Sequence, residues 1–175
     1  MIPLFKPALD QKEIKAVAAV LKSGWIGSGP KVEEFETKFA RFVGAKYAIA
    51  VSSASSALQL ALQSLNLKPQ DEIISPSLTF IATNHAILLN NAVPVFCDVD
   101  PQTLCTDPAD VTRRITPSTR AVIVMHYGGH PADLIALVKL CRKHKIALIE
   151  DCAHATGSYY KNKHVGTFGL MGCFS

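Results

Sequence analysis

Two adjacent acids and a histidine follow an apolar segment near residue 150. The segment Ile-Ala-Leu-Ile at 146–149 is followed by Glu150, by Asp151 and, three residues further on, by His154. A carboxylate at the end of a buried strand is costly in free energy unless a positive group or hydrogen-bond donors meet it. Asp151 is therefore a candidate for pairing with a cationic group of a ligand, whereas Glu150 is expected to serve the structure.

A group of serines precedes a predicted helix at residue 54. Residues 51–56 read Val-Ser-Ser-Ala-Ser-Ser, and backbone N–H groups at a helix start, with hydroxyls beside them, can bind a phosphate. One serine would be enough to cap the helix, so capping alone stays open as an alternative. The chain has no G-x-G-x-x-G turn and no G-x-x-x-x-G-K-[ST] loop, which disfavours a nicotinamide or nucleoside triphosphate site.

Three ring side chains have two readings each. Phe80 follows the second predicted strand and could either fill the core or stack on a flat heteroaromatic ligand. His126 ends an apolar run, so it could be a hydrogen-bonded core histidine. Trp25, the only tryptophan, lies in the glycine-rich loop at 23–30, where it could anchor the loop to the core or belong to a site.

The elements that must position these residues alternate between strand and helix after residue 45. Asp10 and Glu13 predict a capping box for a first helix that Gly24 ends, and a second amphipathic helix ends at Gly44. Strands are predicted at 47–51, 72–75, 93–99, 120–127 and 145–151, and helices at 54–66, 80–90, 107–115 and 131–144. This alternation predicts an α/β fold in which a mostly parallel sheet lies between two layers of helices.

Ligands of open parallel sheets bind beyond the carboxyl ends of the strands, which is where the serines, Phe80 and Asp151 are expected. Together these residues offer a phosphate site, an aromatic surface and a buried acid. A flat, phosphorylated, cationic ring would use all three. Pyridoxal 5′-phosphate (PLP) is such a ring, because its protonated nitrogen pairs with an aspartate and the ring then accepts electrons.

Composition sets wider bounds. The chain has 175 residues, of which 49% are hydrophobic and 18% charged, and its net charge is +4. No apolar run approaches a membrane span and the N-terminus lacks a signal-peptide pattern, so a cytoplasmic protein is expected. The five cysteines show no metal-binding spacing and are expected to be reduced. A basic cluster at 139–145 is typical of a helix end rather than of a nucleic-acid site.

Seven motifs in the same order and spacing carry a resemblance to a known family. They are SGWIGSGP, AVSSASSAL, PSLTFIATNHAI, VPVFCDVD, HYGGHPADL, IEDCAHATGSYYKNKHVG and the final CFS. With these motifs the chain resembles the DegT/StrS-type sugar aminotransferases, which are PLP enzymes of fold type I. It looks most like the branch that acts on nucleotide-linked 4-keto sugars, as in the amino-arabinose pathway of lipid A.

The resemblance implies a role for individual residues. Ala54 and Ser55 would bind the cofactor phosphate, where the family usually has Gly-Thr. Phe80 would stack on the cofactor ring, and Asp151 would pair with the ring nitrogen. His154 would contact the ring or its phenolic oxygen, and Ser175 would touch the phosphate. Trp25 and Ile26 are expected near the substrate entrance.

The same resemblance implies that part of the enzyme lies outside this sequence. In the family, the lysine that forms the Schiff base follows the Phe-Ser pair by about five residues, so it would lie beyond Ser175 and no catalytic residue is expected within the chain. Lys161 and Lys163 match a turn of the family that is not catalytic. Residues 1–45 would form an N-terminal helical segment, residues 46–175 would be part of the large PLP-binding domain, and the small C-terminal domain would be absent.

Three functional hypotheses follow from the residues and the resemblance. The first is a dimeric enzyme that transfers an amino group, with glutamate as the expected donor, to a keto sugar carried on a nucleotide. The second is a PLP-dependent sugar dehydratase, in which histidine replaces the lysine. The third is a truncated chain that binds a ligand or partner without catalysis.

Overall fold

The computed structural model describes residues 7–175 and divides them into two compact units. The first unit contains the described residues up to Phe42 together with Lys46–Ala50, and the second contains Val43–Ala45 and Val51–Ser175. The domain boundary expected at residue 45 stays a prediction. In the part of the chain that the structure describes, no helix combines the length and apolar character needed to cross a membrane.

Two helices and a glycine-rich loop make up most of the first unit. Helix α1 (Gln11–Ser23) has the predicted capping box, in which the Asp10 carboxylate and Glu13 bond reciprocally, and it ends at Gly24 with a left-handed φ of 73°. Helix α2 spans Pro30–Val43. Between them Trp25 is 60% exposed, so it does not anchor the loop to a core. Its Nε1 donates to the Ser28 carbonyl over 2.8 Å, so the loop closes on itself.

The strand predicted at 47–51 is wrong. These residues have no regular secondary structure, although the Ala50 amide donates to the Glu36 carboxylate over 2.8 Å. Tyr47 and Ile49 are 74% and 82% exposed. The residues are apolar enough for a strand, but within the described residues no strand pairs with them, and an extended segment without a ladder partner leaves its backbone groups to water.

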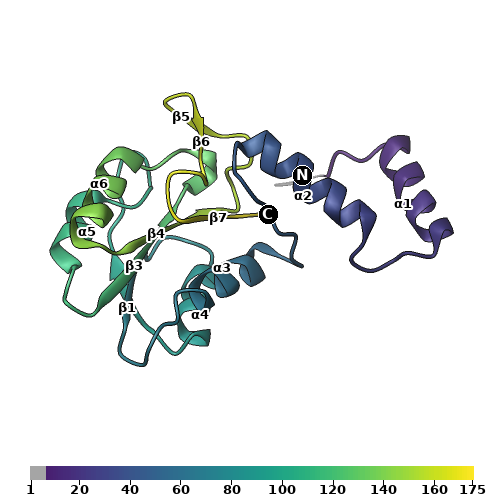
Figure 1. The fold of residues 1–175 in the computed structure, drawn as a ribbon. Helices are drawn as coiled ribbons and strands as arrows, with labels where there is room; N and C mark the ends of the chain where they lie inside the picture. The colour runs from purple at the N-terminus through teal and green to yellow at the C-terminus, as the bar shows by residue number, and fades with distance from the viewer. Residues whose placement is uncertain (1–6) are drawn as a thin grey trace, which may run out of the picture. The chain divides into compact units, whose positions relative to one another are not determined.

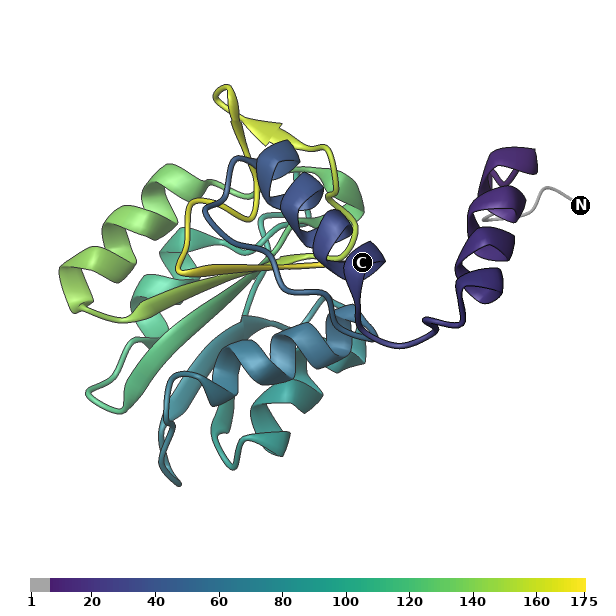
Figure 2. The same cartoon turned by 45° about the vertical axis from the view of Figure 1, so that its right-hand side comes forward.

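The second unit is a parallel sheet between two helical layers, which confirms the predicted α/β class. Its strands lie in the order β2-β1-β3-β4-β7 and every neighbouring pair is parallel. Helices α3 and α4 cover one face, and α5 and α6 cover the other (Figures 1 and 2). The strands are β1 (Glu72–Pro76), β2 (Val93–Cys97), β3 (Thr119–Met125), β4 (Ala147–Cys152) and β7 (Met171–Phe174), and the helices are α3 (Ala54–Gln63), α4 (Ile81–Leu89), α5 (Pro108–Arg114) and α6 (Leu134–His144).

The central strands are apolar on both faces, as parallel strands between helices must be. Alternate residues enter two separate cores. One core, towards α3 and α4, takes Ile73, Ala121, Ile123 and Ile149. The other, towards α5 and α6, takes Ile74, Val122, Val124 and Leu148.

Four short elements were not predicted, and the first of them begins at Tyr127, the last residue of a predicted strand. A 3-10 turn spans Tyr127–Gly129. The strands β5 (Tyr159–Tyr160) and β6 (Lys163–His164) form a hairpin where a simple turn was expected, and β7 follows a segment that contains Gly166 and Gly169. The strand β7 has four residues including Gly172, and glycine is unfavourable in strands. Close packing explains the presence of glycine in this strand, since a Cβ at Gly172 would lie 2.4 Å from the Gly166 carbonyl oxygen.

Replacement of Gly169 by alanine should destabilise the second unit. A Cβ there would lie 2.4 Å from the Leu148 carbonyl oxygen, so backbone atoms of β4 or of the loop would have to move. We expect a loss of about 1–3 kcal/mol in the free energy of unfolding, as for other overpacked sites. Gly27→Ala is the matched control, because its Cβ would meet nothing within 4 Å. Equal urea midpoints for the two variants would contradict this account.

Candidate functional site

The carboxyl edge of the sheet gathers the predicted cofactor residues of the second unit. Because the strands are parallel, β1 and β4 end at the same edge, and α4 begins there after β1 (Figure 1). Helix α3 also begins at this edge, since its far end reaches the start of β7, where the Ser64 hydroxyl lies 3.7 Å from the Met171 sulfur. Ser175 follows β7 at the same edge, beside the end of β4.

The serines before α3 divide between capping and exposure. Ser53 is the N-cap, and its hydroxyl accepts from the Ser56 amide over 3.2 Å. Ser52 bonds the Ser56 hydroxyl at 3.0 Å. Ser55 is exposed, and within the described residues the amides of Ala54 and Ser55 donate to no protein group. Capping therefore uses Ser53, and the first-turn amides that the phosphate prediction requires remain available.

Phe80 is a surface ring rather than a core residue. It occupies the N-cap position of α4 without a side-chain cap bond, and its side chain is 69% exposed. Phe80 and Ser55 line the same hollow of about 290 Å³ between α3 and α4, together with Ser56, Gln59, Ile81, Ala82, His85, Ala86 and Leu89. The predicted phosphate site and the predicted stacking ring therefore border one space.

Asp151 is a buried acid that meets neutral donors. It is 2% exposed, its Oδ2 accepts from the Thr83 hydroxyl over 2.7 Å, and its Oδ1 accepts from the Ala153 amide over 3.1 Å. In the described part of the chain no lysine, arginine or histidine forms an ion pair with it. A buried carboxylate is stabilised best by a cation, so this arrangement suits a positively charged ligand group.

His154 and Ser175 lie at the same edge as Asp151. The exposed His154 ring accepts from the Gly128 amide through Nδ1 over 3.4 Å and lies edge-on to Tyr127 at 6.1 Å. The Ser175 carbonyl accepts from the Thr156 hydroxyl over 3.4 Å. Trp25 and Ile26 belong to the first unit. Their role at the substrate entrance stays a prediction, as do the cofactor contacts of the other residues.

Glu150 has the structural role expected of it. It is fully buried with His126, and its oxygens accept from the His126 ring at 3.2 Å and from the amides of Gly166, Phe168 and Gly169 at 2.6–2.7 Å. The Ala132 amide donates to Nδ1 of His126 over 3.2 Å, so the proton of the neutral ring is on Nε2 and points to Glu150. His126 is therefore a hydrogen-bonded core histidine.

The pKa of Glu150 reflects a balance of burial and hydrogen bonding. Burial by itself raises the pKa, but the hydrogen bonds from His126, Gly169 and Gly166 together outweigh it and hold the pKa below its ordinary value of 4.5. Cys152 has its sulfur within 4.8 Å of ligand atoms of this pair. Since the carboxylate already accepts four protein hydrogen bonds, we interpret this cluster as a packing element and not as an ion site.

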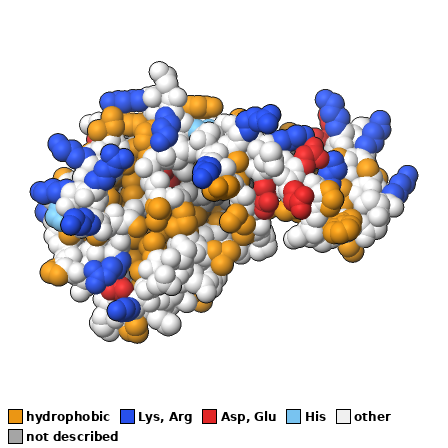
Figure 3. All heavy atoms as spheres, viewed as in Figure 1, with side chains coloured by type: hydrophobic (Ala, Val, Ile, Leu, Met, Phe, Trp, Pro, Cys, Tyr) orange, Lys and Arg blue, Asp and Glu red, His pale blue; other side chains and the backbone are white. Residues whose placement is uncertain are grey.

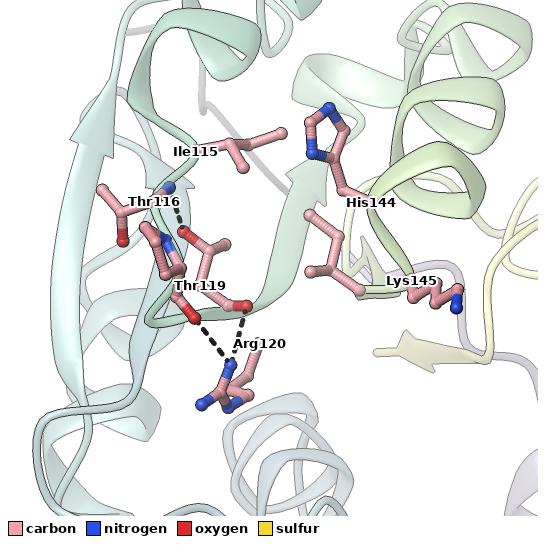
Figure 4. Close-up of a pocket in the computed structure, with 8 residues that line it drawn as sticks. Ile115, Thr116, Thr119, Arg120, His144 and Lys145 are labelled. Atoms are coloured by element: carbon pink, nitrogen blue, oxygen red, sulfur yellow. Dashed lines mark hydrogen bonds between the residues drawn. The ribbon is translucent and has the colours of Figure 1, made fainter.

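A second hollow of about 410 Å³ lies at the opposite edge of the sheet, where β3 begins. The basic side chains around it point in different directions (Figure 4). Arg120 is already bonded to the Pro117 carbonyl at 3.0 Å and paired with Asp71 at 2.9 Å. Without converging groups, this hollow offers no comparable chemistry.

Thr83 is a partner of Asp151 that the sequence did not reveal. It is 1% exposed on α4, one turn after Phe80, and it supplies the hydroxyl that bonds Asp151. The available signal was its position in the first turn of the helix that begins after Phe80, at the carboxyl end of a predicted strand. Its partner is 68 residues away in sequence, so local pattern could not show the contact.

Comparison with known proteins identifies the family. The family model of the DegT/DnrJ/EryC1/StrS aminotransferases matches residues 7–175, and the chain belongs to this family. The aminotransferase TlmJ from Streptoalloteichus hindustanus is 40% identical, with a TM-score of 0.93 over 100% of this chain and 48% of that one.

Two further solved structures are similar. PseC from Helicobacter pylori, an aminotransferase involved in the biosynthesis of pseudoaminic acid, is 32% identical, with a TM-score of 0.93 over 97% of this chain and 46% of that one. A Streptococcus pneumoniae protein provisionally described as a sugar aminotransferase, solved in a PLP form, is 30% identical, with a TM-score of 0.96 over 99% of this chain and 48% of that one. The chain thus spans about half the length of the structures it matches.

Replacement of Glu150 by glutamine should destabilise the fold in a pH-dependent way. The amide group would present N–H groups to a loop that itself donates, so we expect a loss of about 2–4 kcal/mol near pH 7. Because folding lowers the pKa of Glu150, its contribution is complete above the ordinary glutamate pKa and declines as the pH falls through the folded pKa. Urea unfolding between pH 7 and pH 3 should show that the free energies of unfolding of the wild type and of Glu150→Gln converge below about pH 4.

The exposed Glu33 supplies the control for this series. Glu33→Gln removes the same charge without touching a buried network, so its stability should stay within about 0.5 kcal/mol of the wild type. A constant difference between Glu150→Gln and the wild type at every pH would show that Glu150 does not act as a buried anion.

Proposed function

We propose that this chain is the N-terminal part of a PLP-dependent aminotransferase that acts on a nucleotide-linked keto sugar, with glutamate as the amino donor. The observation that carries the proposal is the buried Asp151 carboxylate, which has hydrogen-bond donors but no cationic partner in the described residues. It lies at the sheet edge where the free amides of α3 and the exposed Phe80 ring also lie. Membership of the aminotransferase family supports the same reaction.

Each group at the edge has a defined task in this proposal. The amides of Ala54 and Ser55, with the Ser55 hydroxyl and Ser175, would hold the phosphate. Phe80 would set the plane of the ring, and His154 would contact the ring or its phenolic oxygen. Asp151 would keep a proton on the ring nitrogen. Bound PLP then supplies an electron sink for the negative charge left when a proton leaves the substrate carbon.

Similar proteins and exposed apolar side chains support the proposed substrate and partners. The similarity to PseC and to the provisionally described sugar aminotransferase supports a sugar substrate, and surface polysaccharide or lipid A synthesis would use such a product. A homodimer is supported by apolar side chains left exposed on α3 and α4, including Leu60, Ile81, Leu88 and Leu89. Figure 3 shows hydrophobic side chains gathered on the surface in the region of α3 and β7. Five buried free cysteines suit a reducing, cytoplasmic location.

The lysine expected beyond Ser175 provides a direct test. The full-length gene product should carry PLP, and hydride reduction followed by peptide mass spectrometry should place the cofactor on one lysine downstream of Ser175. PLP bound reversibly with a histidine at that position would favour the dehydratase instead. Absence of PLP from the purified protein and from titrations would contradict both activities.

Phe80 can be tested without a large effect on stability, because it is exposed. Phe80→Ala should weaken PLP binding about 2- to 13-fold, which corresponds to ~0.5–1.5 kcal/mol for a lost aromatic contact. Phe96→Ala is the control, since Phe96 is 49% exposed, does not line the hollow that Phe80 and Ser55 share, and lies on β2, which two other strands separate from β4. Fluorescence titration of both variants measures the difference, and unchanged affinity in Phe80→Ala would remove Phe80 from the site.

A further inference from the structure

Two hydroxyl groups, one just before α4 and one in its first turn, form a chain of hydrogen bonds that ends at Asp151, the candidate counter-ion. The hydroxyl of Thr83 lies 2.7 Å from Oδ2 of Asp151, and the hydroxyl of Thr79 lies 2.7 Å from that of Thr83. Thr83 and Asp151 are both almost completely buried. This contact therefore lies inside the protein, between a helix of one layer and the central sheet.

The direction of the hydrogen bonds follows from the chemistry of the partners. An ionised carboxylate only accepts, so the Thr83 hydroxyl must donate to Asp151. A hydroxyl has one proton, so Thr83 is left to accept from Thr79, which polarises the Thr83 donor further. The order of donation is Thr79 to Thr83 to Asp151, and each bond has the 2.7 Å length of a good O–H···O contact.

The two oxygens of Asp151 are each fixed by one donor. Oδ2 is bonded by Thr83 and Oδ1 by the Ala153 amide, so the plane of the carboxylate cannot turn without losing one of them. Each oxygen accepts through two lone pairs and therefore keeps acceptor capacity for a ligand. Phe80 is the N-cap of α4, and the Thr83 amide in its first turn donates to the Phe80 carbonyl over 3.1 Å, so the start of one helix sets both the ring and the direction of the acid.

We propose that Thr83 is a positioning residue that directs the Asp151 carboxylate at the ring nitrogen of PLP. This inference rests on the proposed function, because it concerns the same ligand. Thr83, a neutral side chain that the sequence did not predict as part of the site, would thus contribute to the recognition of the ring nitrogen. The effect of Thr83 should therefore depend on whether that nitrogen is present.

A pair of ligands separates positioning from general support of the fold. The full-length protein, stripped of cofactor, is titrated with PLP and with 1-deaza-PLP, in which a carbon replaces the ring nitrogen. Thr83→Val keeps the side-chain shape but removes the donor, and we expect PLP to bind roughly 10-fold more weakly, as for loss of a hydrogen bond to a charged group. Binding of the deaza compound should change by less than about 2-fold, and Thr83→Ser should restore PLP binding.

The outcomes distinguish this inference from the function on which it rests. If wild-type protein binds PLP and Thr83→Val binds it equally well, or loses both ligands to the same extent, Thr83 does not position Asp151. If the wild-type protein binds neither ligand, the proposed function fails as well. Should Thr83→Val not fold, Thr79→Val gives the same test, with a loss of roughly 2- to 3-fold expected for PLP alone.

Discussion

A buried carboxylate that accepts four protein hydrogen bonds fixes the carboxyl edge of this sheet. Glu150 is the acceptor for the turn at 166–169 and for His126, so the turn that leads into β7 is held against the end of β4. Without those acceptors the amides of the turn would be partly buried and unpaired. The position of β7, and hence of Ser175 beside the site, depends on this side chain together with the ladder between β4 and β7.

The two neighbouring acids of β4 have opposite tasks because successive residues of a strand point to opposite faces. Glu150 faces the layer of α5 and α6, where the protein itself satisfies it completely. Asp151 faces α4, where it receives two neutral donors and no cation among the described residues. The first acid stabilises the fold, whereas the second holds a charge that a ligand can balance. Burial alone would not distinguish them, since both are nearly inaccessible.

Local signals predicted most of the fold. The capping box of α1, the apolar central strands and the helices of the second unit follow from caps and periodicity, which act over a few residues. The pairing of strands depends on partners that are distant in sequence, and the wrong and missed strand predictions concern this pairing. Residues 47–51 have strand composition but no ladder, whereas β7 has weak strand composition and gains its ladder from β4. Similarly, Asp151 and Phe80 were predicted as site residues because Asp151 lies near the end of a strand and Phe80 shortly after one, but the contact of Asp151 with Thr83 depends on the folded arrangement.

The alternation along β4 also limits how this segment can vary. A shift of one residue in its register would place the longer Glu150 side chain against Thr83 and turn Asp151 towards the 166–169 turn. Neither acid could then reach its partners, and both cores would exchange their side chains. The hairpin of β5 and β6, which pairs only with itself, carries no such requirement. Length changes during evolution should therefore collect at the exposed turn 161–162 and be excluded between 147 and 152.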